Sequence, residues 1–295
     1  MKLQHLAAAA ALLVFSTGPA FALQGFLVTA QSDKKATQQT HSEVKEDLGD
    51  VQPAEQTPLL SRFRASAQAQ GEWISNAALL GNGGEGDFLF LPTLDVGFNQ
   101  PLPHGFSFDL DAKFETVVYS QDSDRGFYGV SGSATFDWRP RPNLPRIFVS
   151  AEPYRYNSFD TDSNVAGAFV ISTGVDQGFF INRGKTLLYG GYKYSQYHAS
   201  PSLDDRGAHR LTAGVTHQFK PSLYGQLYYS FQYSDYREQP SIRHDRRNVV
   251  GLNFVYQLSE HLFTSLTSSY VDNGSSRQLA RYQNYIVGAA VTWQF

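Results

Sequence analysis

Val287-Gly-Ala-Ala-Val-Thr-Trp-Gln-Phe295 stands at the end of the sequence and alternates between apolar and small or polar side chains. Successive side chains of an extended strand point to opposite faces, so every second residue would share one face. The apolar face would hold Val287, Ala289, Val291, Trp293 and Phe295. The stretch therefore predicts a β-strand with one apolar face that ends on an aromatic residue.

The same alternation begins near Arg62 and recurs through the rest of the chain. In the segment 105–119 the two faces differ completely in polarity. One face holds Phe106, Phe108, Leu110, Ala112 and Phe114, and the other holds Ser107, Asp109, Asp111, Lys113 and Glu115. The predicted strands are about 62–75, 87–99, 105–119, 126–139, 146–158, 165–180, 185–198, 208–219, 222–236, 247–258, 261–271 and 284–295.

Strand length and connection pattern separate a membrane barrel from a soluble sandwich, whose strands also alternate. Most predicted strands run for about 11–15 residues, whereas a globular strand averages about 5–6 and a tilted membrane-spanning strand needs about 9–11. Tight turns alternate with polar, mostly longer connections, as in outer-membrane barrels. The predicted fold is all-β: a transmembrane antiparallel up-and-down β-barrel of about 12 strands, with short periplasmic turns and longer extracellular loops. The predicted turns are 100–104, 139–145, 182–184, 220–222 and 259–260, and the predicted loops are 75–87, 121–125, 160–164, 199–207, 236–246 and 272–282.

Aromatic residues gather near the ends of the predicted strands. At a membrane interface, an amphipathic ring places its apolar body in lipid and its polar edge in water. Tyr119 is expected at this interface near a long loop. The other predicted interface aromatics are Trp73, Trp138, Trp293, Tyr233 and Tyr285.

The segment 146–158 departs from the alternation because Pro153 and Arg155 continue its apolar face. Proline has no N–H to donate to a strand ladder, so a β-bulge is predicted at Pro153, with a shift of the alternation after it. Without that shift, Arg155 would face lipid.

The first 60 residues differ in kind from the rest of the chain. Residues 1–22 combine Lys2, the apolar run 6–15 and an Ala20-Phe21-Ala22 cleavage motif, which indicates a cleaved signal peptide. Residues 23–60 are polar and aperiodic, and we expect a flexible periplasmic linker, with a plug or docking arm as the alternative. The barrel would then comprise residues 61–295.

The composition excludes several kinds of site. The chain has no cysteine, which rules out disulfides and thiolate metal sites. Its formal net charge of -3 gives no reason to expect a nucleic-acid partner. No catalytic residue, metal or cofactor is predicted, and the oligomeric state stays open.

The polar faces of the strands would line the inside of the barrel, where charges need partners or water. About eight strands are just filled by side chains, so about 12 would enclose extra space. The interior is then either a network of paired charges or a water-filled pore whose acidic wall faces basic residues. The predicted pore-lining residues are Arg64, Asp95, Asp109, Asp111, Lys113, Glu115, Asp137, Glu152, Asp176, Lys193 and Arg210.

The predicted connection around 236–247 is rich in basic side chains, namely Arg237, Arg243, His244, Arg246 and Arg247. These side chains would bind phosphates of outer-leaflet lipid or draw anions to the mouth of the barrel. A loop of solvated charges is the alternative interpretation.

His198 and Ser200 form a His-x-Ser pair, in which a histidine base could activate a serine nucleophile against an ester. The pair resembles one found in outer-membrane phospholipases and lipid A deacylases. Those families continue with asparagine where this chain has Pro201, and the sequence identifies no residue to orient the imidazole. We therefore predict that the protein is not an enzyme, with a lipid hydrolase based on this pair as an alternative.

The C-terminal strand that ends at Phe295 resembles the assembly signal of bacterial outer-membrane β-barrels. In architecture, residues 62–295 resemble that class, and within it porins of about twelve strands. The resemblance implies an outer-membrane location, contact with outer-membrane lipid and lipopolysaccharide, and insertion by the barrel assembly machinery. It also implies a porin-like channel for the passive passage of small hydrophilic solutes.

Two further functions stay open. Tyr- and Ser-rich strands next to Arg-bearing loops, at 223–247 and 262–281, also resemble barrels that accompany exopolysaccharide export. An export or assembly component for a surface polysaccharide is therefore an alternative to the channel. A structural barrel with a plugged lumen is another.

Overall fold

The computed structural model of the chain describes residues 62–77, 84–121, 126–141, 144–160, 164–182, 184–200, 202–237 and 243–295. The predicted signal peptide, 1–22, and the predicted linker, 23–60, lie outside the described residues. The described residues form twelve β-strands: β1 (Phe63–Ile74), β2 (Asp87–Pro101), β3 (Phe106–Tyr119), β4 (Phe127–Trp138), β5 (Arg146–Ser158), β6 (Asn164–Ile181), β7 (Thr186–Ser200), β8 (Arg206–Lys220), β9 (Leu223–Tyr236), β10 (Arg243–Gln257), β11 (Leu262–Ser275) and β12 (Tyr282–Gln294).

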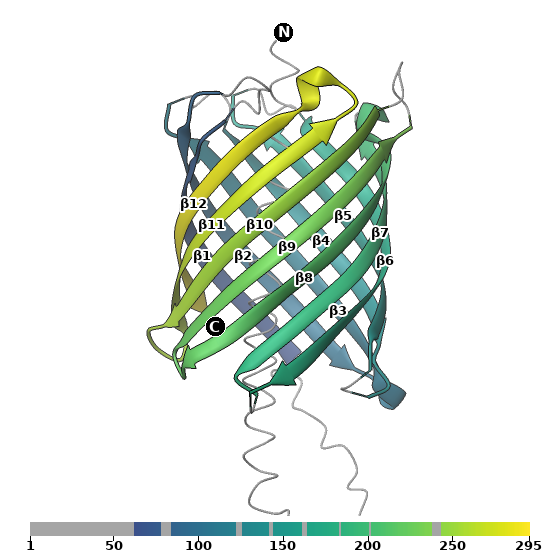
Figure 1. Cartoon of the computed structure of the whole chain (residues 1–295), viewed down its shortest axis with the longest axis vertical. Helices are drawn as coiled ribbons and strands as arrows, with labels where there is room; N and C mark the ends of the chain where they lie inside the picture. The colour runs from purple at the N-terminus through teal and green to yellow at the C-terminus, as the bar shows by residue number, and fades with distance from the viewer. Residues whose placement is uncertain are drawn as a thin grey trace, which may run out of the picture.

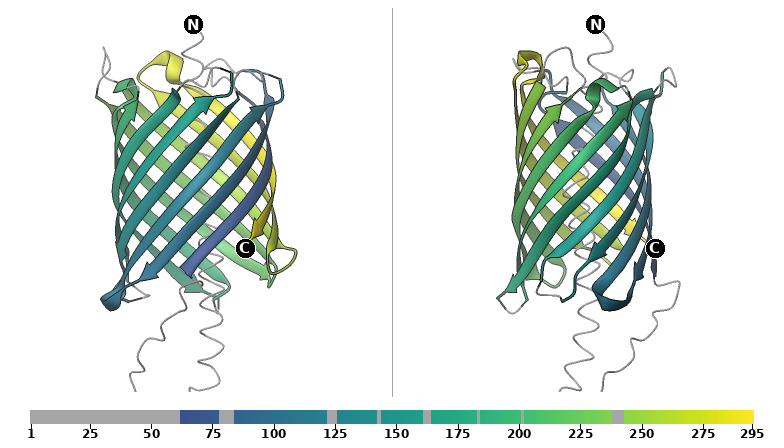
Figure 2. Two further views of the ribbon diagram at one scale, coloured as in Figure 1. Left: turned by 180° about the vertical axis from the view of Figure 1, so that it is seen from behind. Right: turned by 90° about the vertical axis from the view of Figure 1, so that its right-hand side faces the viewer.

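Each strand pairs antiparallel with its neighbours in sequence, and the sheet closes on itself where β1 meets β12. The result is a cylinder of tilted strands (Figures 1 and 2). At the closure, Ser66 lies opposite Gln294 and Ile74 opposite Ile286. The backbone amide of Phe295 extends this seam by donating a hydrogen bond to the carbonyl of Ala65 at 2.9 Å. The predicted antiparallel up-and-down barrel is confirmed.

The two ends of the barrel carry different connections. At the end that we call the turn end, the chain passes from β2 to β3, from β4 to β5, from β6 to β7, from β8 to β9 and from β10 to β11. At the other end, the loop end, it passes from β1 to β2, from β3 to β4, from β5 to β6, from β7 to β8, from β9 to β10 and from β11 to β12. Strands extend farther into the loop end than predicted, because β8 begins at Arg206, β10 begins at Arg243 and β11 continues to Ser275. Backbone pairing therefore continues beyond the stretch in which apolar residues alternate.

Three short 3-10 helices lie in connections among the described residues. They are η2 (Pro103–Gly105), η4 (Ser202–Asp204) and η5 (Gln278–Ala280). Within the described ranges, no helix has the length and apolar character needed to cross a membrane.

Along most of their length, the strands have one apolar, exposed face and one polar, covered face. Leu94 and Leu252 expose 55% and 41% of their surface, whereas the adjacent Asp95 and Asn253 expose 7% and 5%. In a closed cylinder, the exposed face is the outer one. An outer surface of large apolar side chains is the pattern of a barrel surrounded by hydrocarbon and is the reverse of a soluble protein.

The predicted bulge at Pro153 is wrong. The register of β5 against β4 is unchanged across this residue, and the irregularity lies between Tyr156 and Asn157 in the pairing with β6. The alternation therefore continues past Pro153, which keeps Arg155 on the outer face. There the Nε of Arg155 donates to Asn157 Oδ1 at 3.1 Å.

The interior of the barrel also contains apolar side chains. At the loop end of β1–β5, Ile74 and Phe127 are fully buried on the inward side. We call this group the apolar cluster; its buried members are Ile74, Ala77, Leu89, Leu91, Val117, Tyr119, Phe127 and Tyr156. Tyr119 therefore does not lie at the membrane interface as predicted, because it shares the inward side of β3 with Val117. The cluster fills part of the interior beside β1–β5.

Candidate functional site

The charged side chains that the sequence assigns to the pore lie on the covered face of the strands, in two groups. The acidic residues belong to β2–β6, and the predicted cations Lys193 and Arg210 belong to β7 and β8. In the order of the closed sheet, β7–β10 lie across the cylinder from β1–β4. The acidic group comprises Asp95, Asp109, Asp111, Glu115, Asp137, Glu152 and Asp176, together with the cations Arg64 and Lys113.

Arg64 on β1 reaches across β2 to the acidic residues of β3. Its guanidinium donates to Asp111 Oδ1 and lies 4.0 Å from Asp109 Oδ1, and Asp109 also accepts from Asn99 Nδ2 at 2.6 Å. Gly97 on β2 is the cross-strand partner of both Arg64 and Asp111. A Cβ at Gly97 would lie 2.5 Å from Arg64 Nε and 2.7 Å from Asp111 Oδ1, so a side chain there would displace the ion pair.

Glu115 is the centre of a second group that spans three strands. The phenol of Tyr156 on β5 donates to Glu115 Oε1 at 2.6 Å, and the ammonium of Lys113 pairs with Oε2. Gly129 on β4 lies opposite both Glu115 and Tyr156, and a Cβ there would overlap the Tyr156 ring. Because Glu115 exposes only 4% of its surface, its charge needs these partners.

Asp176 on β6 accepts hydrogen bonds from two arginines at the turn end of β5 and β6. Arg146 donates to Asp176 Oδ2 through Nε at 3.0 Å and through Nη2 at 2.7 Å, and Arg139 Nη2 donates to Oδ1 at 3.3 Å. Nearby, Asp137 accepts from Ser107 Oγ at 2.6 Å. Much of the acidic group is thus engaged by neighbouring cations and donors. Arg146 is not among the predicted pore-lining residues, although it falls on the inward parity of the predicted strand 146–158.

A second group of cations lies at one level of β7–β10, and we call Lys193, Arg210 and Arg247 the basic row. Lys193 is the cross-strand partner of Arg210, and Gln232 separates Arg210 from Arg247. Arg210 donates to Gln232 Oε1 through Nε at 3.0 Å and Nη2 at 2.6 Å. Neither Lys193 nor Arg210 forms an ion pair with a residue in the described ranges.

Two further arginines alternate with tyrosines between the basic row and the loop end. The cross-strand partners run Tyr197–Arg206–Tyr236–Arg243, and we call these four residues the aromatic ladder. The guanidinium of Arg206 lies 4.0 Å from the Tyr197 ring centre and 5.5 Å from that of Tyr236. The guanidinium of Arg243 lies 4.2 Å from the Tyr236 ring and donates to Asp245 Oδ1 at 3.0 Å. These distances are those of cation–π contacts.

The basic segment around 236–247 therefore divides between the two faces of β10. Arg243 and Arg247 share the inward side, whereas His244 and Arg246 share the outer side. His244 Nδ1 lies 2.9 Å from the Tyr233 hydroxyl, and the two rings stack at 16°. Arg243, Arg247 and Arg206 are not among the predicted pore-lining residues, because the sequence predicts loops or a strand end at these positions. Continued parity counting would have identified the two on β10.

Residues 201–295, about a third of the chain, match the model of a family described as Putative beta-barrel porin 2. In structure, the chain is similar to an outer membrane channel from Pseudomonas putida F1, with a TM-score of 0.55 at 10% identity over 83% of this chain and 100% of that chain. The protein has the fold of a porin-like outer-membrane β-barrel.

The porin-like barrel is also similar to the translocator domain of the autotransporter NalP from Neisseria meningitidis. That comparison has a TM-score of 0.47 at 14% identity and covers 91% of this chain and 97% of that chain. No curated protein matches the chain in sequence.

The His198–Ser200 pair lies on the outer face of the porin-like barrel at the loop end of β7. Both residues are exposed, and in the described part of the chain neither side chain forms a hydrogen bond or an ion pair. The arrangement lacks the base-to-nucleophile hydrogen bond that activates a serine. The described residues also contain no group of three or more His, Cys, Asp or Glu that could hold a metal ion.

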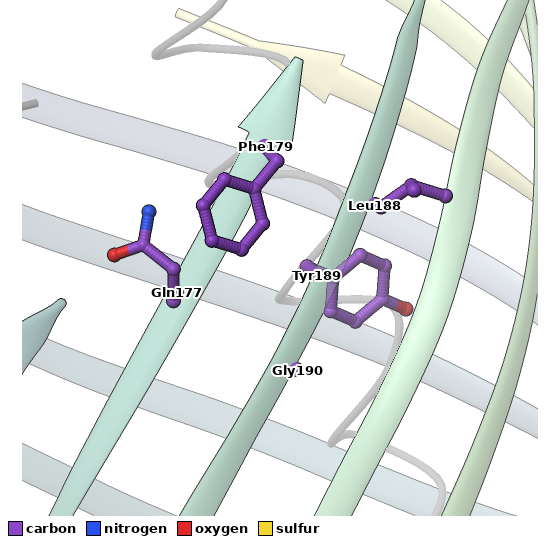
Figure 3. Close-up of a pocket in the computed structure, with 5 residues that line it drawn as sticks. All are labelled: Gln177, Phe179, Leu188, Tyr189 and Gly190. Atoms are coloured by element: carbon purple, nitrogen blue, oxygen red, sulfur yellow. The ribbon is translucent and has the colours of Figure 1, made fainter. Parts of the chain in front are cut away.

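A shallow depression lies between β6 and β7 of the porin-like barrel (Figure 3). Its lining residues are Gln177, Phe179, Leu188, Tyr189 and Gly190. Phe179 and Leu188 expose 57% and 41% of their surface and belong to the outer face. The depression therefore lies on the apolar exterior, apart from the charged interior.

The predicted interface aromatics lie on the outer face of the porin-like barrel. Trp138 and Trp293 belong to the turn end, and Trp73, Tyr233 and Tyr285 belong to the loop end. Their two levels are those expected of interfacial belts. Phe295 is also exposed at the turn end of the seam, and its role as an assembly signal stays a prediction.

Proposed function

We propose that the protein is an outer-membrane channel for the passive passage of small hydrophilic solutes. The observation that carries this proposal is the division of the inward face into an acidic group on β2–β6 and a basic row and aromatic ladder on β7–β10. Walls of opposite charge that face each other set up a transverse field, which favours water and polar solutes over apolar ones. Charges without water would be very costly in such an interior.

The size of the barrel supports the same proposal. About eight strands are just filled by side chains, and the described strands exceed that number. Small polar residues occupy inward positions near mid-strand, and the hydroxyls of Ser172 and Ser195 lie 2.8 Å apart there. The apolar cluster narrows the interior beside β1–β5. The solute path would therefore run along β6–β10, beside the aromatic ladder and the basic row.

The apolar outer face supports a location in the outer membrane. The turn end would face the periplasm after cleavage of the signal peptide and insertion by the barrel assembly machinery. Outer-membrane lipid would surround the apolar face. Lipopolysaccharide phosphates would meet exposed cations of the loop end, such as Arg237.

The channel can be tested by electrical recording of the purified full-length protein in a planar lipid bilayer. We expect stepwise conductance that grows with KCl concentration, and the same preparation after heat unfolding is the control. Swelling of liposomes in neutral sugars of increasing size would measure the size limit. If protein that is shown to be folded, by its altered migration on an unheated gel, carries no current and admits no sugar, the channel is refuted and a closed structural barrel takes its place.

A further inference from the structure

The basic row places like charges next to one another on the inner wall. Lys193 and Arg210 are direct cross-strand partners, and Arg247 lies two strands beyond Arg210 at the same level. Directly opposed side chains have Cβ atoms about 4.5–5.5 Å apart, and like charges in such a pair destabilise a sheet. With strands about 4.8 Å apart, the basic row extends for roughly 15 Å around the wall.

The immediate neighbours of Lys193 and Arg210 do little to offset their charge. The partner that Arg210 contacts is Gln232, which is neutral. Glu152 is near enough to Lys193 to interact electrostatically, but among the described residues no carboxylate lies within 4.0 Å of the Lys193 ammonium. Arg64 and Arg146, by contrast, each contact a carboxylate of the acidic group directly. Positive charge is therefore left to attract a mobile anion at Lys193 and Arg210.

The aromatic ladder adds a second feature on the side of the loop end. Arg206 exposes only 9% of its surface, and its Nε has no hydrogen-bond partner in the described part of the chain. Contacts with Tyr197 and Tyr236 hold the guanidinium in place. Tyr197 and Lys193 are four residues apart on β7, so the ladder and the row are separated by about 13 Å along the strand. An anion that enters from the loop end would pass the aromatic ladder before it reaches the basic row.

We infer that the basic row is a binding site for solutes that carry carboxylate or phosphate groups. The inference rests on the proposed channel and gives that channel a substrate class. A guanidinium binds such groups through paired, charge-assisted hydrogen bonds, and an ammonium binds them as a point charge. The tyrosine rings of the ladder offer flat apolar surfaces to the carbon skeleton of the solute. Several weak sites in series suit transport, because a solute must also leave.

The test compares two double variants that remove the same charge from opposite faces. Lys193→Gln with Arg210→Gln changes the inner wall, and Arg155→Gln with Arg246→Gln changes the outer face. The first readout is the unfolding temperature of the folded full-length protein in detergent, with inorganic phosphate or with KCl of equal ionic strength. The second is the reversal potential in a planar bilayer under a KCl gradient, which reports the ratio of chloride to potassium permeability.

We expect phosphate to raise the unfolding temperature of the wild type and of the outer-face variant, because a ligand that binds only the folded state stabilises it. The inner-wall variant should lose this shift, and its permeability ratio should fall by about threefold or more. If the inner-wall double variant does not fold, the single variant Lys193→Gln is measured in the same assays.

The outcomes separate the site from the channel. A wild type that phosphate does not stabilise, or an inner-wall variant that behaves like the outer-face variant, overturns the anion site even when the protein conducts. Loss of the phosphate shift in the inner-wall variant alone, in a protein that never conducts, supports the site and overturns the proposed channel.

Discussion

Tyr156 and Glu115 form a hydrogen bond of 2.6 Å across the full width of β4, although they belong to strands that do not pair with each other. Gly129 makes the contact possible, since its lack of a side chain lets the phenol lie over the backbone. The same arrangement recurs where Gly97 lies between Arg64 and Asp111. Glycine on the inward face thus allows polar groups to interact over two strand spacings.

The first prediction concerns the Tyr156 hydroxyl. Tyr156→Phe keeps the ring but leaves Glu115 Oε1 without its donor, and we expect the free energy of unfolding to fall by about 1–2 kcal/mol. Urea unfolding in lipid vesicles, followed by tryptophan fluorescence, measures this change. Tyr154→Phe is the control, because the Tyr154 hydroxyl forms no hydrogen bond with a described residue. Equal losses in the two variants would contradict the assignment.

A second prediction concerns the glycine itself. Gly129→Ala places a methyl group against the Tyr156 ring, so the ring must move, and we expect a loss of about 1–3 kcal/mol from crowding. Gly132→Ala on the same strand is the matched control, because its Cβ would meet only the Asp111 carbonyl oxygen, at 3.5 Å. The expected order of stability in urea is wild type and Gly132→Ala together, then Gly129→Ala. The reverse order would show that the close approach is not needed.

A third prediction concerns the countercharge of the acidic group. Arg64→Gln removes the cation that contacts Asp111 and Asp109. In the proposed channel we therefore expect the ratio of potassium to chloride permeability to rise. The reversal potential under a KCl gradient reports the change. Arg64→Lys keeps the charge and should stay close to the wild type, and a shift of equal size in both variants would point to altered geometry rather than altered charge.

A fourth prediction concerns His198 and Ser200. Their side chains are exposed and form no hydrogen bond with each other, so Ser200→Ala should leave the lipid composition of the outer membrane unchanged. Mass spectrometry of phospholipids and lipid A, extracted from cells that carry the wild type or Ser200→Ala, measures the lipid composition. An ester-cleaved lipid that appears with the wild type and disappears with Ser200→Ala would establish a hydrolase.

A fifth prediction concerns the terminal aromatic residue. Phe295 exposes 75% of its surface, and its backbone amide bonds to Ala65, so Phe295→Ala keeps the seam while it removes the ring. We expect the amount of folded barrel in the outer membrane to fall, with little change in the stability of purified protein. Leu258→Ala removes another exposed apolar side chain at the turn end and serves as the control. Equal yields from both variants would refute a specific assembly signal.

The fold could be predicted from the sequence because the alternation is a local property of each segment. The strand boundaries at the loop end could not be predicted, because polar residues occur there on both faces while backbone pairing continues. Arg243, for instance, begins β10 within a stretch that the sequence presents as a charged loop. Pro153 was misread for a related reason, because a proline in a strand does not by itself require a register shift.

The charged faces of the strands were predictable, but the contacts between them were not. Leu89 and Leu91 alternate with Phe88 and Phe90, so both faces of β2 are apolar there and parity does not tell which side joins the apolar cluster. The aromatic ladder depends on the registers of β7–β10 together, and these are set by turns and pairing far apart in the chain. Sequence reasoning therefore found the outer surface more completely than the inner one.

The seam between β1 and β12 joins the first and the last of the described strands, so a chain that is interrupted before β12 cannot complete it. A chain that stops before Tyr282 lacks β12 and would leave the edges of β1 and β11 with unsatisfied amides and carbonyls. Hydrocarbon tolerates no such edges, because it offers nothing to hydrogen-bond with. Synthesis of the chain through β12 is thus a physical condition for a closed sheet within a bilayer.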